Sequence, residues 1–263
     1  MASHRKALGV VSKKKWGQHF LVCKHIAQAE ADFGINKKVI EIGSGRGILT
    51  KALCEKAKHV ISFEIDSVLY EMLKGEIEYK NLEIHNMDFF DANEKMLDGY
   101  EMLIANIPYN LSSKIVEWSM TKKIDAVLCM QKEFCAHMLA KPNSHAYSKI
   151  SVMCSLMAHV GFIMNVPAGC FMPIPKVDSS VVYIKPKKEV FDPMAIKIMG
   201  HIMEHKKKKA KGALIDSCKA LGISKDRMKN IVLGIDGLEK RGFQMEPLEM
   251  YNIALQIKKN INV

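Results

Sequence analysis

The chain has 263 residues, of which 25% are charged, and its formal net charge is +11. This length accommodates one large domain and a small one, and the excess of basic residues is typical of a protein that binds a polyanion. No apolar stretch is long enough to span a membrane and the N-terminus lacks the apolar core of a signal peptide, so we expect a cytoplasmic protein with no membrane partner.

The positive charge lies near the two ends of the sequence. Residues 1–26, which we expect to form a basic arm leading into a first helix, carry +6. Residues 27–184 carry −3, and residues 185–263 carry +8. The densest lysine run, Lys206 to Lys209 with Lys211, lies in the last segment. Such runs often serve only to solvate a helix face, but this one also suits phosphate contacts.

The first predicted strand, residues 38–42, runs directly into the loop Gly43-Ser44-Gly45-Arg46-Gly47, which a helical pattern follows. Strand, glycine loop and helix form the nucleotide-binding opening of a doubly wound sheet. The glycine spacing differs from the Gly-x-Gly-x-x-Gly of dinucleotide enzymes, which disfavours an oxidoreductase and leaves a plain tight turn as the other interpretation. Glu41, just before the loop, favours a cationic ligand such as the amino-acid end of S-adenosylmethionine.

Acidic residues follow the next two predicted strands. Residues 60–63 end at Glu64, about 20 positions beyond the glycine loop, where a carboxylate can accept hydrogen bonds from ribose hydroxyls. Residues 82–87 end at Asp88, whose carboxylate could accept from an adenine amino group while Phe89 packs on the ring. Either acid could instead cap a helix or turn. Because ligands bind at the carboxyl ends of such strands, we expect these positions to share one crevice.

The fourth predicted strand, residues 102–105, leads into Asn106-Ile107-Pro108-Tyr109. This tetrapeptide offers an amide oxygen, a backbone carbonyl stiffened by proline and an aromatic face. The ring can stack on a planar base, and two fixed acceptors can draw the lone pair of an exocyclic amine out of conjugation, so that it attacks a methyl group. The combination favours methylation of an amino group on a base, although an ordinary strand and turn would have the same outline.

The remaining pattern completes one α/β domain and adds a helical one. Before a linker at residues 185–188 we expect one helix, residues 131–139, and three strands, residues 125–130, 159–166 and 179–184. Beyond the linker, apolar residues recur only at helical spacing. We therefore expect an α/β domain with a mixed seven-stranded sheet over residues 1–186 and a small all-helical domain over residues 187–263.

Four segments, in this order along the chain, resemble the small-subunit ribosomal RNA adenine N6,N6-dimethyltransferase family. They are Lys15–Leu21, Glu41–Gly47, Asn106–Tyr109 and Phe171–Ser179, and the last matches the family's Phe-x-Pro-x-Pro-x-Val-x-Ser pattern. The resemblance extends from about Lys13 to near the C-terminus. It implies a Rossmann-like class I methyltransferase that uses S-adenosylmethionine and carries a helical domain for RNA or ribosome binding.

The resemblance also implies roles for particular residues. The expected cofactor contacts are Gln18, His19, Leu21, Gly43, Gly45, Glu64, Ile65, Asp88, Phe89 and Asn106. The expected catalytic residues are Asn106, Pro108, Tyr109 and Phe171. Tyr109 and Phe171 would hold the flipped adenine between their rings, because a base stacked in RNA is out of reach. No general base is expected, since the proton on the attacked nitrogen becomes acidic and can leave after the transfer.

The implied reaction is dimethylation of two adjacent adenosines in the hairpin loop near the 3′ end of small-subunit, 16S-type rRNA. The implied partner is the 30S particle, and we expect a monomer that also takes part in small-subunit biogenesis. Two alternatives remain open: a large-subunit rRNA adenine methyltransferase, and a non-catalytic ribosome-assembly factor that binds RNA.

Seven cysteines occur without a Cys-x-x-Cys pair. We therefore expect neither a metal site nor a disulfide framework, and cysteines that stay reduced as they do in the cytoplasm.

Overall fold

The computed structural model of the protein describes residues 18–261, which form two compact units. Unit 1 comprises the chain up to Phe134 together with Gly161–Lys185, and unit 2 comprises Cys135–Val160 together with the chain from Pro186. Most of the expected basic arm and the start of the Lys15–Leu21 segment lie outside the described residues.

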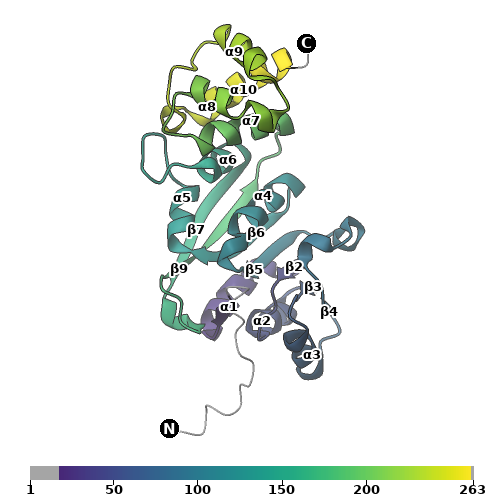
Figure 1. The fold of residues 1–263 in the computed structure, drawn as a ribbon. Coiled ribbons are helices and arrows are strands. Elements are labelled where there is room, and N and C mark those ends of the chain that lie inside the picture. The colour runs from purple at the N-terminus through teal and green to yellow at the C-terminus, as the bar shows by residue number, and fades with distance from the viewer. Residues whose placement is uncertain (1–17, 262–263) are drawn as a thin grey trace. The chain divides into compact units, whose positions relative to one another are not determined.

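Figure 1 labels the main helices and strands of the described residues. The strands are β1 (Phe20–Leu21), β2 (Lys38–Ile42), β3 (His59–Phe63), β4 (Leu82–His85), β5 (Met102–Asn106), β6 (Asp125–Gln131), β7 (Ala158–Val166), β8 (Phe171–Met172) and β9 (Ser179–Pro186). The helices are α1 (Lys24–Ala31), α2 (Ile48–Lys56), α3 (Ser67–Glu76), α4 (Ser112–Lys122), α5 (Lys132–Met138), α6 (Lys149–Met157), α7 (Pro193–Glu204), α8 (Ala210–Asp216), α9 (Lys225–Leu233) and α10 (Pro247–Ile261).

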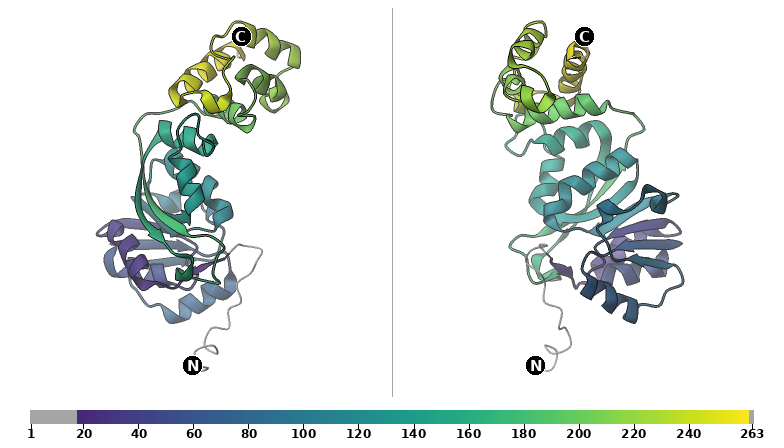
Figure 2. Two further views of the ribbon diagram at one scale, coloured as in Figure 1. Left: turned by 90° about the vertical axis from the view of Figure 1, so that its left-hand side faces the viewer. Right: turned by 45° about the vertical axis from the view of Figure 1, so that its right-hand side comes forward.

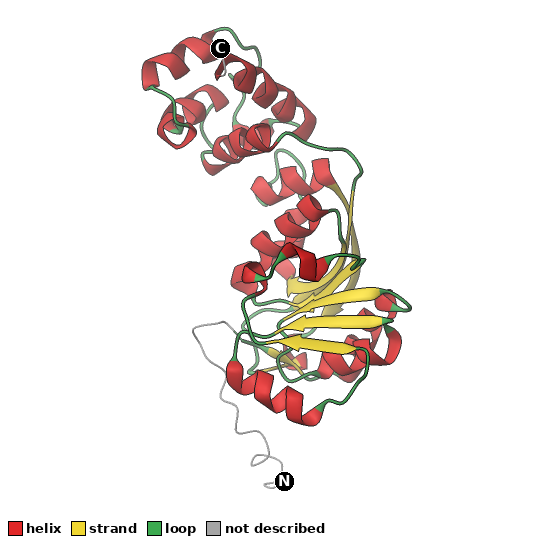
Figure 3. Cartoon of the chain, turned by 90° about the vertical axis from the view of Figure 1, so that its right-hand side faces the viewer, coloured by secondary structure: helices red, strands yellow, loops and turns green. Residues whose placement is uncertain are grey.

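The predicted mixed seven-stranded sheet is confirmed, with the strand order β4-β3-β2-β5-β6-β9-β7. Figure 3 draws the strands in yellow. β4, β3, β2, β5 and β6 pair in parallel, whereas β9 runs antiparallel to β6. The chain proceeds outward from β2 to β4 and then returns to β5 on the other side of β2. Such a reversal of strand order opens a crevice at the carboxyl ends of the strands, where ligands of this fold class bind.

The central strands are apolar on both faces, as buried parallel strands are. Val39 and Ile40 in β2 and the run Met102–Ala105 in β5 have no exposed surface. Helices α1 and α2 pack against each other, and their apolar residues join those of β2 and β5 in one core (Figure 1). This core fixes the strand ends from which the site is built.

Two short strands outside the main sheet form a ribbon of their own. β1 pairs antiparallel with β8, with Phe20 opposite Met172 and Leu21 opposite Phe171. The sequence analysis predicted neither strand, because two-residue strands leave no periodic pattern. The ribbon joins the first and the last of the four family segments.

Unit 2 is helical apart from the start of β7 and the end of β9 (Figure 2). Helix α7 begins after Asp192, whose carboxylate accepts hydrogen bonds from the amides of Met194 and Ala195. Pro193 suits the first helical turn, where no amide donor is needed. Helix α10 buries Met250, Ile253, Ala254 and Ile257 at the spacing of one helix face.

The division into units differs in one segment from the expected boundary at residues 186 and 187. Residues 135–160 belong to the helical unit because α6 packs against α7 and α10. Helix α6 is buried at nearly every position, including Ile150, Val152 and Leu156. A helix of this kind packs against other elements on several of its faces. Within the described residues, no helix combines the length and the apolar character needed to cross a membrane.

Candidate active site

A pocket in unit 1 lies at the carboxyl ends of β2, β3, β4 and β5. The residues to which the family resemblance assigns cofactor binding or catalysis line it: Gln18, His19, Leu21, Gly43, Gly45, Glu64, Ile65, Asp88, Phe89, Asn106, Pro108, Tyr109 and Phe171. The expected crevice therefore exists, and it brings together residues from both ends of the unit's sequence.

The glycine loop leaves its backbone open toward the pocket. Gly43 has a φ of 77°, which favours glycine, and its amide donates to the Phe63 carbonyl (2.8 Å). A Cβ placed on Gly43 would meet no atom within 4 Å. A ligand can therefore approach the main chain here closely.

Glu64 is anchored at the end of β3 by backbone amides. It is 3% exposed, and its two carboxylate oxygens accept hydrogen bonds from the amides of Gly45 and Asp66, both at 2.9 Å. Burial raises the pKa of Glu64, while these hydrogen bonds lower it. Because each carboxylate oxygen has a second lone pair, Glu64 can still accept from a ligand hydroxyl.

Asp88 and Phe89 form the wall after β4. One Asp88 carboxylate oxygen accepts from the amide of Phe90 (2.9 Å), so the expected capping alternative is also present, at the start of the 3-10 turn Phe89–Asp91. Phe89 is buried edge-on against Phe63 and Trp118. Both a carboxylate and an aromatic residue therefore line this side of the pocket.

Asn106 is the last residue of β5, and its side-chain amide is held by a hydrogen bond to Glu30. Its Nδ2 donates to Oε2 of Glu30 (2.9 Å), and its Oδ1 is buried without a hydrogen-bond partner among the described residues. The Pro108 carbonyl accepts from the amide of Leu111 (2.9 Å), which leaves it one lone pair. Two acceptors therefore remain available in the tetrapeptide.

Tyr109 and His19 stack on each other at the pocket. Their ring centroids are 5.6 Å apart with an interplanar angle of 25°. The Tyr109 hydroxyl bonds to the Ser179 hydroxyl (2.9 Å), and His19 Nδ1 donates to the Pro173 carbonyl (2.7 Å). Burial raises the pKa of Tyr109 although the Ser179 bond lowers it, so the phenol stays protonated.

Phe171 reaches the pocket through the β1–β8 ribbon. It is 4% exposed and lies opposite Leu21. The next backbone bond along the ribbon, from the amide of Val22 to the Cys170 carbonyl (2.8 Å), keeps the two segments in register. Residues 150 positions apart in the sequence are thereby placed on one side of the pocket.

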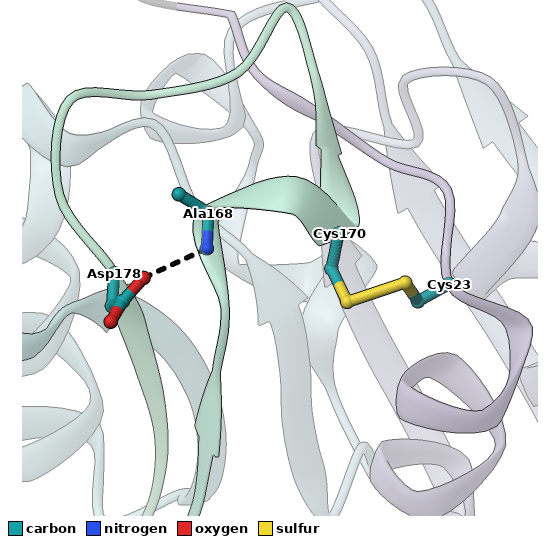
Figure 4. The surroundings of a disulfide bond; sticks show 4 residues. All are labelled: Cys23, Ala168, Cys170 and Asp178. Atoms are coloured by element: carbon teal, nitrogen blue, oxygen red, sulfur yellow. Dashed lines mark hydrogen bonds between the residues drawn. A yellow bond between two sulfur atoms is a disulfide. The ribbon is translucent and has the colours of Figure 1, made fainter.

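The expectation that no disulfide forms is wrong for one pair of cysteines. Cys23 and Cys170 are joined by a disulfide, with their Cα atoms 5.1 Å apart (Figure 4). Asp178 accepts from the amide of Ala168 (2.9 Å) in the same turn. The pair is 147 positions apart, so its spacing carries no motif, and only the pairing of β1 with β8 brings the cysteines together.

Glu41 does not face the pocket as the sequence suggested. It is 1% exposed, and its Oε2 accepts from the hydroxyls of Thr50 (2.8 Å) and Ser62 (2.7 Å). Its pKa is raised to about 7, chiefly by burial, although the two hydroxyls act to lower it. Glu41 thus ties β2 to α2 and β3, and the cationic end of a ligand would meet other groups.

Other residues of the pocket were missed from the sequence although they lie within or beside the matched segments. Phe20 and Arg46 line the pocket, and the Arg46 guanidinium lies 5.0 Å from the centre of the Phe20 ring. Phe90 also lines it, with Lys114 Nζ 3.5 Å from its ring centre. Their position inside the Lys15–Leu21 segment and the glycine loop could have identified the first two.

Two features of the pocket are compatible with a ligand that consists of a nucleoside and an amino acid. The space in front of Gly43 accommodates a ligand against the backbone, and the Asn106 oxygen, which has no partner in the described part of the chain, is open to a donor. Glu64 and Asp88 add carboxylates where ribose hydroxyls and an adenine amine would lie. The same pocket extends to Tyr109 and Phe171, which leaves a second, aromatic region for a base.

Comparison with known proteins agrees with the family that the sequence motifs resemble. The sequence model of the family described as ribosomal RNA adenine dimethylase matches residues 10–233. The chain is 34% identical to a probable ribosomal RNA small subunit methyltransferase A of Methanopyrus kandleri, over 98% of this chain and 96% of that protein. It is 33% identical to the protein of the same name in Pyrococcus furiosus, over 95% and 94%.

Solved structures confirm the predicted Rossmann-like methyltransferase fold. A dimethyladenosine transferase from Plasmodium falciparum is similar with a TM-score of 0.72 and 25% identity, covering 92% of this chain and 98% of that chain. The 23S rRNA methyltransferase ErmE is similar with a TM-score of 0.57 and 23% identity over 93% of this chain and 100% of that one, which shows the fold alone. On these matches, which span nearly its whole length, the chain belongs to the ribosomal RNA adenine dimethylase family.

Proposed function

We propose that this chain transfers methyl groups from S-adenosylmethionine to N6 of two adjacent adenosines near the 3′ end of small-subunit rRNA, within the 30S particle. The chain is an rRNA adenine N6,N6-dimethyltransferase, and the target adenosines and the particle are the finer part of the proposal. The observation that carries it is the buried Oδ1 of Asn106, which has no hydrogen-bond partner among residues 18–261 and belongs to a pocket that Tyr109 and Phe171 also line.

The chain's own residues fit the cofactor. Gly43 and Gly45 would hold its amino-acid end against the backbone, with Gln18, His19 and Leu21 nearby. Glu64 would accept from the ribose hydroxyls and Asp88 from the adenine amine, while Ile65 and Phe89 would pack on the adenine ring. When bound, S-adenosylmethionine supplies an electrophilic methyl group attached to a sulfonium.

The tetrapeptide would prepare the target amine for attack. Asn106 Oδ1 and the free lone pair of the Pro108 carbonyl would accept the two N6 hydrogens and draw the nitrogen toward a tetrahedral geometry, in which its lone pair is available. Stacking between Tyr109 and Phe171 would fix the base at the distance and angle that transfer requires. Catalysis would therefore depend on orientation and on two fixed acceptors.

Two polar ring groups at the pocket, on His19 and Tyr109, are engaged in hydrogen bonds. His19 Nδ1 is bonded to the Pro173 carbonyl, and the Tyr109 hydroxyl is bonded to Ser179. The proton on the methylated nitrogen is strongly acidic and can pass to water after the transfer. Because that proton can leave without help, the reaction that we propose includes no general base.

We expect only some lysines of the run that begins at Lys206 to contact RNA phosphates. Lys206 Nζ donates to the carbonyls of His145 (3.2 Å) and Tyr147 (2.5 Å), so it is a structural residue of unit 2. Lys208 and Lys209 are paired with Asp216 and Glu239. The exposed Lys207 has no ion pair within residues 18–261 and is the member that we assign to the RNA backbone.

The decisive experiment is methyl transfer from labelled S-adenosylmethionine to unmodified small subunits, followed by mapping of the modified nucleotides. We expect two dimethylated adenosines, side by side, in the hairpin loop near the 3′ end. Labelling of isolated large subunits instead would favour the large-subunit alternative. Binding to subunits without transfer would favour the assembly factor, and a preference of the chain for immature over mature particles would support a role in biogenesis.

We infer that the chain acts as a monomer in the cytoplasm, where small subunits are assembled. A reducing compartment would hold Cys23 and Cys170 as thiols. Sedimentation of the purified chain and the number of titratable thiols in freshly lysed cells test these two points.

A further inference from the structure

Behind Asn106 lies a buried carboxyl group that the reaction does not contact. Glu30, near the end of α1, is 1% exposed and is not among the residues that line the pocket. Its Oε2 accepts the hydrogen bond from Asn106 Nδ2 at 2.9 Å, across 76 positions of sequence. The Glu30–Asn106 hydrogen bond thus links helix α1 to the end of β5.

This contact decides which end of the Asn106 amide faces the pocket. An asparagine amide has a donor end and an acceptor end, and rotation about one bond exchanges them. The Glu30 oxygen is an acceptor, so it engages Nδ2 and leaves Oδ1 on the other side. Within the described part of the chain, Oδ1 has no hydrogen-bond partner, which is costly for a buried oxygen unless a ligand supplies the donor.

We propose that Glu30 is a positioning residue that holds the Asn106 oxygen toward the target amine. This inference rests on the proposed function, since it concerns how that reaction's acceptor is oriented. Without Glu30, the amide could turn its Nδ2 toward the base, and a donor would then face the N6 hydrogens. The base would bind in a pocket of unchanged shape, but its amine would no longer be polarised.

The surroundings of Glu30 favour a neutral side chain there. The pKa of Glu30 is raised to about 8, chiefly by burial and also by nearby Glu41, although the Asn106 bond acts to lower it. A protonated carboxyl still offers its carbonyl oxygen to Asn106. Glutamine offers the same oxygen in the same volume, so it should replace Glu30 with little effect.

The test compares Glu30→Leu with Glu30→Gln in methyl transfer to unmodified small subunits. We expect Glu30→Leu to lower kcat by about 10–100-fold, because a misoriented group of this kind costs that much even when binding is intact. The KM for subunits and the Kd for S-adenosylmethionine should stay within about 3-fold. Glu30→Gln should keep kcat within about 3-fold, and Gln28→Leu on the exposed face of α1 is the matched control.

A double-mutant cycle separates positioning from general damage. If Glu30 acts through Asn106, then Glu30→Leu should add no further loss in an Asn106→Ala background. Additive losses would overturn the inference, as would a parallel loss of cofactor affinity or equal activity of the Leu and wild-type chains. If Glu30→Leu is poorly folded by its melting curve, Glu30→Met carries the same expectation.

The wild-type reaction keeps the two proposals distinguishable. An active wild-type chain with an equally active Glu30→Leu variant rejects only the role of Glu30. A wild-type chain that binds S-adenosylmethionine but transfers no methyl group to small subunits rejects the proposed function, and the role of Glu30 with it.

Discussion

The two walls of the pocket are built in different ways. The cofactor wall (Gly43, Gly45, Glu64 and Asp88) follows successive strands, and two of its hydrogen bonds join residues two positions apart. The base wall (Asn106, Pro108, Tyr109 and Phe171) depends on distant partners. Asn106 is held by a residue 76 positions away and Tyr109 by one 70 positions away.

This difference has a functional meaning. A wall made of strand ends and their own turns keeps its shape as long as the sheet is folded. A wall held by distant side chains can lose its alignment while the fold persists. We therefore expect substitutions in the cofactor wall to change affinity, and substitutions in the base wall to change the rate of transfer.

The largest expected effect is that of Asn106→Ala in the base wall. Loss of a fixed group that stabilises developing charge typically costs about 100–1000-fold in kcat. The Kd for S-adenosylmethionine, measured by calorimetry, should stay within about 3-fold of wild type. If cofactor affinity fell together with activity, Asn106 would support the pocket rather than the chemistry, and the two walls would not be separable.

In the cofactor wall, Glu64→Ala should raise the Kd for S-adenosylmethionine by about 10–100-fold, the range for hydrogen bonds to a charged group. Activity should return to within a few-fold of wild type at saturating cofactor, because the base wall is unchanged. Glu55→Ala, on the exposed side of α2, is the control. A loss of kcat that cofactor cannot restore would contradict the division of roles.

Two buried carboxyl groups belong to neither wall: Glu30 is bonded to Asn106, and Glu41 lies in β2, two positions before Gly43. Burial raises their pKa values to about 8 and about 7, so the folded chain binds protons that the unfolded chain releases. Stability from both groups is present below pH 4.5 and is lost as pH rises through 7 and 8.

We therefore expect the melting temperature to fall between pH 5 and pH 9, by about 2–4 °C for each kcal/mol lost. Glu30→Gln should flatten this fall up to about pH 8, and Glu41→Gln should flatten it only up to about pH 7, so that only Glu30→Gln changes the slope between pH 7 and pH 8. Calorimetric scans at several pH values test this. Identical slopes in all three chains would show that neither carboxyl carries a raised pKa.

The smallest expected effect on activity is that of Cys23→Ser, which removes the disulfide beside the base wall. The β1–β8 backbone bonds still hold Phe171, so kcat should stay within about 3-fold under oxidising conditions. The free energy of unfolding should drop by about 2–4 kcal/mol, since a closed loop no longer restricts the unfolded chain. A reducing agent should abolish that difference, and a large change in kcat would show that the disulfide aligns the wall.

Most of the fold could be predicted from the sequence because its strands and helices have strong local patterns. The seven strands of the main sheet, including β2 and β5, appear within a residue or two of their predicted bounds. The boundary near residue 186 was visible as a change from strand to helical spacing. The assignment of residues 135–160 to the helical unit was not, because an apolar helix does not reveal which neighbours cover it.

The pocket residues could be recognised from motifs, but their partners could not. Glycines, carboxylates and the Asn-Ile-Pro-Tyr tetrapeptide each stand at a strand end, and the order of the strands brings them together. The inward direction of Glu41 escaped prediction, since alternation along a strand shows that neighbours face opposite sides without showing which side is the pocket.

What the sequence by itself determined is the chemistry of the site: which atoms can accept hydrogen bonds, which rings can stack and where the backbone is open. Only the tertiary structure decided how those atoms are oriented. The Glu30–Asn106 contact and the Cys23–Cys170 disulfide join segments 76 and 147 positions apart, through the packing of α1 and the pairing of β1 with β8. In the sequence, Glu30 looks like one more charged residue on a helix, and such residues are usually exposed; its burial follows from packing that no local pattern encodes.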